Sequence, residues 1–178
     1  DVYKRQDNYG QNEDWFELYN NSGSPINLNS YYLSDKNDNL TKWQFNSDVI
    51  INANEHLVIF CSGRNEINGG NIHTGFKLHQ TKGNEWIILT NPDGVTIVDS
   101  VFIRPCLTNS SRGRLNYTDN TQGVFNTPTP GALNTAGYID YSTTPVFSPA
   151  AGIHNNPINV TITADLGTTI YFTTDGSP

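Results

Sequence analysis

A polar segment in the first quarter of the chain has the residue types that bind calcium. Its candidate ligands are Asp35, Asn37, Asp38 and Asn39. Side-chain oxygens at alternating positions are the ligands that Ca²⁺ prefers in protein loops. An EF-hand loop also needs a central glycine and a final glutamate, where this sequence has Leu40 and Asn46. The segment therefore predicts either a weak calcium site or a plain solvated loop, and no other cofactor is expected.

Aromatic side chains near the N-terminus are candidates for stacking on a sugar ring. Trp15 and Tyr19 alternate with Phe16 and Leu18 in a stretch typical of a strand. Alternate residues of a strand point to opposite faces, so Phe16 and Leu18 supply a core face. Trp15 and Tyr19 are then the aromatic residues expected to be exposed, if any are. The alternative is that the aromatic side chains pack in the core or in cross-strand pairs.

A local basic cluster is the third candidate site. Arg112 and Arg114 belong to the sequence Ser-Arg-Gly-Arg, and Arg104 precedes them. An arginine side chain can bind a carboxylate or a phosphate through two parallel hydrogen bonds. The alternative is a loop that surface ion pairs anchor to its own domain.

Nothing in the sequence has the spacing of a catalytic centre. The four histidines show no metal-ligand spacing, and no Gly-x-Ser-x-Gly motif occurs. Glu17 is the one acid inside a strong strand, but catalysis by a carboxylate pair needs a second acid at a set distance. We therefore predict that Glu17 is a hydrogen-bonded structural carboxylate and that the chain is not an enzyme. Cys61 and Cys106 either form one disulfide or remain unpaired.

Short apolar strands separated by polar turns must position all of these residues. Strands are predicted over 14–20, 25–28, 31–33, 41–45, 49–51, 56–60, 85–89, 95–101, 159–162 and 168–172. Asn91-Pro92-Asp93-Gly94 predicts a tight turn, and 82–84 predicts a hairpin turn. The Gly- and Asn-rich residues 62–75 are expected to form a loop. Strands at this spacing favour an all-β sandwich.

Composition and charge narrow the possible partners. The chain has 178 residues and a net charge of −7, and charged residues make up only 15% of it. Nucleic-acid binders usually carry a basic surface, so neither nucleic acid nor an anionic membrane surface is an expected partner. No apolar run has the length of a membrane span. The chain is expected to bind other domains of its own protein, a cell-surface protein or a polysaccharide.

The sequence also predicts how the chain is divided. Residues 1–8 are interpreted as an artefactual or disordered lead, because 1–6 look like translated adapter or vector sequence. A first domain is expected over 9–134, and the Pro-rich residues 127–131 mark its end. Residues 135–144 are expected to form a linker. Residues 145–178 have too few strands to bury a core, so they predict a truncated second sandwich-type domain.

The first domain resembles the bacterial form of the lamin-tail domain, an immunoglobulin-like β-sandwich. The matching segments, in order, are DWFELYN at 14–20, PINL at 25–28, YYLSD at 31–35, KWQF at 42–45, HLVIF at 56–60, HTGFKL at 73–78, NPDGVTIVDSV at 91–101, SRGR at 111–114 and TPTPGALN at 127–134. The resemblance implies one more strand before 14–20, where the doubtful N-terminal residues stand. If that strand is missing, one sheet edge is unpaired and open to association.

The end of the chain resembles the first half of the small domain at the C-terminus of chitobiases and β-hexosaminidases. The matching segments are PVFSPAAGIHNNPINVTI at 145–162 and TTIYFTTDGSP at 168–178. The two resemblances imply a modular bacterial protein that is extracellular or at the cell surface. The function that they imply is non-catalytic adhesion, tethering or scaffolding. The alternative is an accessory carbohydrate-binding module of a secreted hydrolase.

Overall fold

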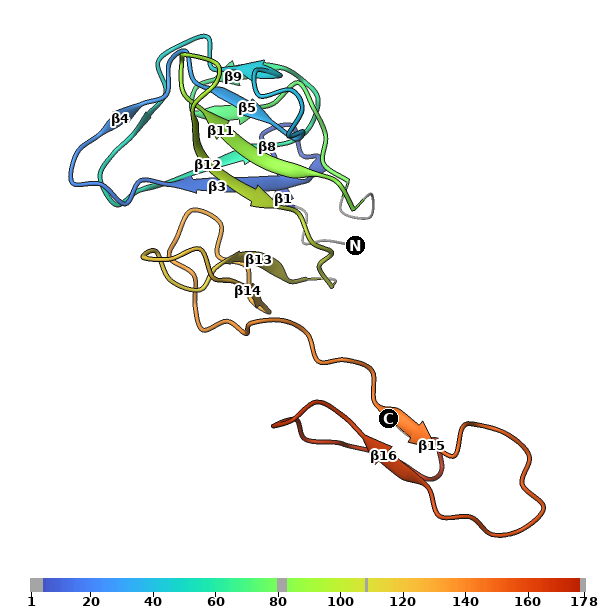
Figure 1. The fold of residues 1–178 in the computed structure, drawn as a ribbon. Coiled ribbons are helices and arrows are strands. Elements are labelled where there is room, and N and C mark those ends of the chain that lie inside the picture. The colour runs from blue at the N-terminus through green and yellow to red at the C-terminus, as the bar shows by residue number, and fades with distance from the viewer. Residues whose placement is uncertain (1–4, 80–82, 108, 177–178) are drawn as a thin grey trace. The chain divides into compact units, whose positions relative to one another are not determined.

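The structure is a computed structural model that describes residues 5–79, 83–107 and 109–176 (Figure 1). It divides into two compact units, Asp1–Ile139 and Asp140–Pro178. The described residues form strands and turns and contain no helix. The prediction of an all-β, immunoglobulin-like sandwich is confirmed. The predicted hairpin turn at 82–84 begins outside the described residues.

Two four-stranded sheets make up the sandwich of the first unit. One sheet runs in the order β3 (Trp15–Tyr19), β8 (His56–Phe60), β10 (Asn71–His73) and β9 (Glu66–Asn68). The other runs in the order β12 (Ile97–Phe102), β11 (Trp86–Thr90), β5 (Tyr32–Ser34) and β6 (Trp43–Gln44). A short ladder joins β4 (Ile26–Asn27) to β7 (Ile50–Ile51). β3 and β12 are therefore both terminal strands of their sheets.

The alternation of the sequence explains which faces are buried. Phe16 of β3 and Ile59 of β8 are buried in the core, as are Trp43 and Phe45 around β6. The Trp43 and Phe45 rings meet edge to face, with centroids 4.9 Å apart. Such contacts between aromatic rings add to the stability that apolar burial provides. The predicted core face of β3 is confirmed.

The turn at 91–94 is confirmed, and it joins β11 to β12 as an antiparallel hairpin. The Gly94 amide donates to the Asn91 carbonyl at 2.9 Å, and the Asn91 amide donates to the Thr96 carbonyl at 2.8 Å. Gly94 has a φ of 74°, a conformation that costs glycine little. Turn chemistry alone was sufficient to predict this hairpin.

The prediction of a loop over 62–75 is wrong, because β9 and β10 form a hairpin inside it. Gly69 and Gly70 connect these strands with φ values of 56° and 86°. Two consecutive residues with positive φ match the twist of a tight hairpin, and glycine adopts that conformation readily. β10 then pairs with β8 in parallel, with His73 opposite Phe60. The same glycines that indicated a loop thus make the turn.

Residues 5–8, the described part of the segment interpreted as an artefactual or disordered lead, are ordered in the structure. β1 (Arg5–Gln6) pairs with β2 (Asn12–Glu13), and Asp7 is buried in the turn between them. Asp7 Oδ1 accepts hydrogen bonds from the amides of Tyr9 and Gln11. Aspartate favours such turns because its side chain can satisfy backbone donors within the turn.

A further hairpin follows the sandwich within the first unit. β13 (Ser111–Arg114) pairs with β14 (Gln122–Phe125). Tyr138 forms an antiparallel bridge with Val124, through the hydrogen bonds between their backbones. The first unit thus continues to Ile139, beyond the predicted domain end at 134.

The second unit contains one pair of strands, β15 (Val146–Ser148) and β16 (Thr161–Thr163). Its large apolar side chains are exposed, including Phe172, which retains 71% of its accessible surface. The predicted strand at 168–172 is wrong, because the backbone forms no strand there. A strand needs a neighbour to satisfy its backbone, and two strands cannot bury a core by themselves.

Candidate functional site

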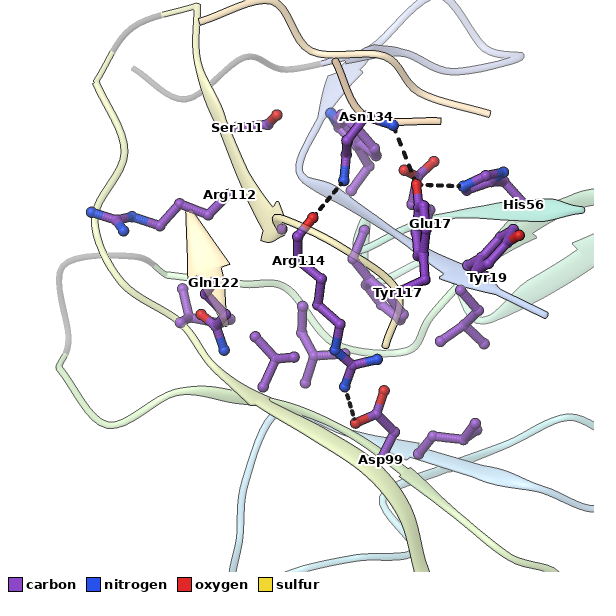
Figure 2. A pocket seen from close by; sticks show the side chains of 18 of the residues that line it. Glu17, Tyr19, His56, Asp99, Ser111, Arg112, Arg114, Tyr117, Gln122 and Asn134 are labelled. Carbon is purple, nitrogen blue, oxygen red and sulfur yellow. Dashed lines mark hydrogen bonds and ion pairs between the residues drawn. The ribbon is translucent and has the colours of Figure 1, made fainter. Parts of the chain in front are cut away.

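The sandwich of the first unit is open along one side, between its two terminal strands β3 and β12. A cleft of about 630 Å³ lies there, and residues of β3, β12 and the β13–β14 hairpin line it (Figure 2). Trp15, Tyr19, Arg112 and Arg114, the four predicted ligand-binding residues, all line this cleft. The structure thus brings together side chains that lie far apart in the sequence. The predicted calcium ligands do not line it.

The floor of the cleft is apolar because it reaches the space between the sheets. Leu18 of β3, Ile87 and Leu89 of β11, and Val101 of β12 line it. Ile87 lies opposite Val101 in the β11–β12 ladder, so both side chains are on the same face. A ligand that enters the cleft would therefore meet hydrocarbon at its base.

The hydrogen-bond pattern of β3 sets the direction of its backbone groups. The Cys61 amide donates to the Asp14 carbonyl at 2.8 Å, and the Asn20 amide donates to the Glu55 carbonyl at 3.0 Å. In an antiparallel ladder, hydrogen-bonded and non-hydrogen-bonded pairs alternate. Positions 14, 16, 18 and 20 therefore bond toward β8, and the backbone groups of Glu17 and Tyr19 point to the opposite side. Among the described residues, no strand pairs with β3 on that side.

An aromatic cluster closes one end of the cleft. The Tyr19 ring is 4.3 Å from the Tyr117 ring and 4.5 Å from the His56 ring, measured between centroids. The Tyr117 hydroxyl is 3.5 Å from His56 Nε2, and it accepts a hydrogen bond from the Asn134 amide at 3.2 Å. Burial lowers the pKa of His56. Tyr19 is half-buried, and its ring contacts the rings of Tyr117 and His56.

Glu17 fixes the chain that follows β14 against β3. Its Oε2 accepts a hydrogen bond from the Gly131 amide at 2.9 Å. Burial raises the pKa of Glu17, although the Gly131 hydrogen bond and the charge of Arg5 act in the opposite direction. A carboxylate loses solvation when it is partly buried, so its neutral, protonated form is favoured. The structure agrees with the prediction of a hydrogen-bonded structural carboxylate.

The two arginines of the predicted basic cluster make anchoring contacts. Arg114 Nη2 lies 2.6 Å from Asp99 Oδ1 and joins the hairpin to β12 (Figure 2). Arg112 Nε donates to the Pro105 carbonyl at 2.9 Å. These contacts match the alternative in which the arginines anchor their own segment. Asp99, His56, Tyr117 and Asn134 were not predicted as site residues, since their roles depend on contacts between distant segments.

One member of the predicted calcium segment is buried and paired with a lysine, and the other three are at the surface. Asp35 is buried, and its Oδ1 lies 2.5 Å from Lys42 Nζ. Asn37, Asp38 and Asn39 are exposed to solvent. In the part of the chain that the structure describes, no cluster of three or more His, Cys, Asp or Glu side chains is arranged to hold a metal ion.

A contact between a serine and a histidine lies away from the cleft. Ser62 Oγ is 3.0 Å from His73 Nδ1, and His73 Nε2 is 2.8 Å from Asn8 Oδ1. Both Ser62 and His73 are buried. A general base must come within hydrogen-bonding reach of its substrate, so burial makes this contact structural. This contact could not be predicted, because the spacing of these residues matches no local motif.

The two cysteines are not joined to each other. Cys61 is buried in the core, and burial raises the pKa of its thiol. Cys106 lies in a half-buried segment and lines the cleft. Of the two predicted alternatives, the disulfide between Cys61 and Cys106 is therefore not formed.

Comparison with known families identifies the first unit. The sequence model described as Lamin Tail Domain matches residues 2–104. The chain belongs to the lamin tail domain family. No curated protein and no solved structure was found to match the chain. The match covers both sheets and ends before the β13–β14 hairpin of this lamin tail domain protein. Among its described residues, no helix is long and apolar enough to cross a membrane.

Proposed function

We propose that the chain is a non-catalytic tethering module of an extracellular, multidomain bacterial protein, and that it binds its partner in the cleft between β3 and β12. The observation that carries this proposal is the opening of the sandwich between its two terminal strands. Apolar floor residues and directed backbone groups meet at this opening. A rigid sandwich that presents such a cleft favours binding over chemistry.

The properties of lamin tail domains support the non-catalytic part of the proposal. An immunoglobulin-like domain of this family is generally non-catalytic. Within the cleft, Glu17 is held by Gly131 and Asp99 is held by Arg114. Asp99 is thus used to hold the hairpin in position, and Glu17 to hold the chain that follows it.

The arrangement of the aromatic residues supports a protein partner over a sugar. Carbohydrate stacking at Tyr19 needs an accessible ring face, and the rings of Tyr117 and His56, whose centroids lie 4.3 and 4.5 Å away, already cover part of the Tyr19 ring. A carbohydrate-binding role in a secreted hydrolase would therefore depend on Trp15, which is half-buried on the same strand. The proposal accordingly favours a cell-surface protein as the partner.

The extracellular and bacterial context rests on the resemblances of the two parts of the chain. The residues at 145–162 and 168–178 support a chitobiase-type second domain. Long-read sequencing of the source DNA tests this context. A secretion or sorting signal in the same reading frame, with further β modules, is the expected result. A catalytic domain in that frame would favour the accessory-module alternative.

Binding to intact cells of the source organism tests the cleft. Val101→Arg places a charged side chain on the apolar floor, while Val95→Arg changes an exposed residue in the turn before β12. We expect cell binding by the parent chain and by Val95→Arg, and loss of binding by Val101→Arg. Ser111→Arg, on the hairpin side of the cleft, provides a second blocking variant.

Treatment of the cells distinguishes a protein partner from a polysaccharide partner. Mild proteolysis of the cell surface should abolish binding, and enzymatic removal of surface polysaccharide should leave it intact. Thermal melts confirm that each variant folds. Equal binding by folded Val101→Arg, Ser111→Arg and parent chains would refute a tethering function of the cleft.

A further inference from the structure

We infer that the partner enters the cleft as an extended peptide strand that pairs with the open edge of β3. This inference rests on the proposed tethering function and specifies the chemistry of its partner. A terminal strand presents backbone donors and acceptors to any extended chain that reaches it. Addition of a strand to a sheet edge is a general mode of peptide recognition.

The register of β3 determines which groups the peptide would meet. The hydrogen bonds of Asp14 and Asn20 toward the β8 side fix the alternation. The backbone N–H and C=O groups of Glu17 and Tyr19 point to the cleft side. An incoming strand would exchange hydrogen bonds with these two residues, which are spaced as one ladder repeat.

The walls of the cleft specify the side chains of the peptide. On one face of an incoming strand, the apolar floor formed by Leu18 and Val101 favours apolar side chains. On the other face lies Glu17, a half-buried carboxylate with one oxygen held by the Gly131 amide. Opposite charges on neighbouring strands attract, so a lysine or arginine opposite Glu17 is favoured. The expected partner segment is therefore alternately apolar and polar, with a basic residue at its centre.

A second copy of this chain is a poorer occupant of the same edge. Symmetric antiparallel pairing over the full length of β3 would place Glu17 directly opposite Glu17 of the second copy. Like charges directly opposite each other destabilise a strand pair. The edge thus favours a basic foreign segment over its own copy.

Selection from a library of short random peptides tests this inference, with the full chain as target and Val101→Arg for counter-selection. We expect enrichment of alternating sequences with a central lysine or arginine. Each enriched peptide is then synthesised with single backbone N-methyl groups. Every second amide of the bound peptide should face β3, and methylation of any of these amides should weaken binding about tenfold. Methylation of the amides between them, which point away from β3, should have little effect. No enrichment, or binding that is insensitive to backbone methylation, would overturn the inference.

Two further measurements connect the peptide to β3. Hydrogen exchange at the amides of Glu17 and Tyr19 should slow when peptide is bound, while exchange in β15 stays unchanged. Glu17→Gln should weaken a lysine-centred peptide about threefold and leave a glutamine-centred peptide unchanged. If bound peptide slows hydrogen exchange at other amides but not at those of Glu17 and Tyr19, the result would contradict strand pairing. Sedimentation of the free chain reveals self-pairing, and a dimer through β3 would also contradict a foreign partner.

The outcomes separate this inference from the function on which it rests. If Val101→Arg abolishes cell binding but no peptide shows backbone-dependent affinity, tethering remains and strand pairing is refuted. If Val101→Arg leaves cell binding unchanged, the tethering function of the cleft fails whatever the peptides do.

Discussion

The Tyr117 ring lies 4.3 Å from the Tyr19 ring, and this contact joins the hairpin segment to the edge strand of the sandwich. The two residues are far apart in the sequence, and Tyr117 lies in the loop just after the end of β13. Together with the Arg114–Asp99 ion pair, the contact connects the hairpin to both sheets. The width of the cleft therefore depends on a few side chains that hold the hairpin over an open side.

Replacement of Tyr117 by alanine should loosen the hairpin. A contact between aromatic rings is worth about 1 kcal/mol beyond the area that it buries, so Tyr117→Ala should lower the free energy of unfolding by about 1.5 kcal/mol. Tyr117→Phe keeps the ring and removes only the hydroxyl that Asn134 contacts. Denaturant titration of both variants measures the difference.

A matched control for this experiment is Tyr171→Ala in the second unit. Tyr171 retains 90% of its accessible surface, so its removal should change the unfolding free energy very little. Hydrogen exchange of residues 111–134 should be faster in Tyr117→Ala and unchanged in Tyr171→Ala. Equal exchange in both variants would mean that the ring contact does not hold the hairpin.

Glu17 should make the stability of the first unit depend on pH. Burial raises its folded pKa above the ordinary value of 4.5, so the folded state holds this proton more tightly than the unfolded state. The protonated Glu17 side chain makes its full contribution to folding stability below the pKa that it has in the unfolded chain. This contribution is lost as the pH rises through the pKa that it has in the folded chain. The parent chain should therefore lose stability relative to Glu17→Gln as the pH rises across this window.

Glutamine is the suitable replacement because its amide oxygen can still accept the Gly131 hydrogen bond. Thermal melts of both chains from acidic to neutral pH give the difference at each pH. A difference that stays constant, or that changes in the other direction, would show that burial does not control this carboxylate.

Much of the fold could be predicted because it depends on local patterns. The strand at 56–60 and the turn at 91–94 follow from a continuous apolar run and from Pro and Gly at fixed turn positions. The hairpin within 62–75 was missed because glycines indicate loops and tight turns equally well. The predicted strand at 168–172 failed for the opposite reason, since its pattern fits a strand but the second unit offers it no partner.

The candidate site was predictable only in part. Trp15, Tyr19, Arg112 and Arg114 could be named from residue type, and the structure brings all of them to one cleft. Tyr117 and Asp99 could not be named, because their importance arises from side-chain contacts across the sandwich. The openness of β3 is likewise a property of strand order, which sequence periodicity does not contain.

The glycine turn between β9 and β10 should be sensitive to substitution. Gly70 has a φ of 86°, and a side chain in the left-handed region costs about 1 kcal/mol. Gly70→Ala should lower the free energy of unfolding by about that amount, although nothing lies within 4 Å of the added Cβ. Gly23→Ala is the control, because its Cβ is also unobstructed and its backbone lies outside this region. Equal stability of the two variants in urea titrations would contradict a strained turn.

Cys61 should be unreactive in the folded chain. Burial raises the pKa of its thiol, and the thiolate is the form that reacts with alkylating and disulfide reagents. A thiol reagent at neutral pH should therefore label Cys106 before Cys61, and denaturant should expose Cys61. Mass spectrometry of proteolytic peptides assigns the label to each cysteine. Labelling of Cys61 as rapid as that of Cys106 in the native chain would place its thiol outside a closed core.

Calcium should leave the melting temperature of the chain unchanged. Asp35 is the buried member of the candidate ligand set, and Lys42 holds its carboxylate at 2.5 Å. A calcium ion would have to displace this ammonium group, and the exposed Asn37, Asp38 and Asn39 would have to become ordered around it at a cost in entropy. A ligand that binds only the folded state raises the melting temperature, and the rise grows as the ligand concentration increases above the dissociation constant. Melts in excess calcium and in chelator should therefore coincide.

The variant Lys42→Met removes the competing cation, so a rise in melting temperature with calcium in this variant alone would show that the ion pair excludes the metal. A rise in the parent chain would instead establish that the loop binds calcium despite Lys42.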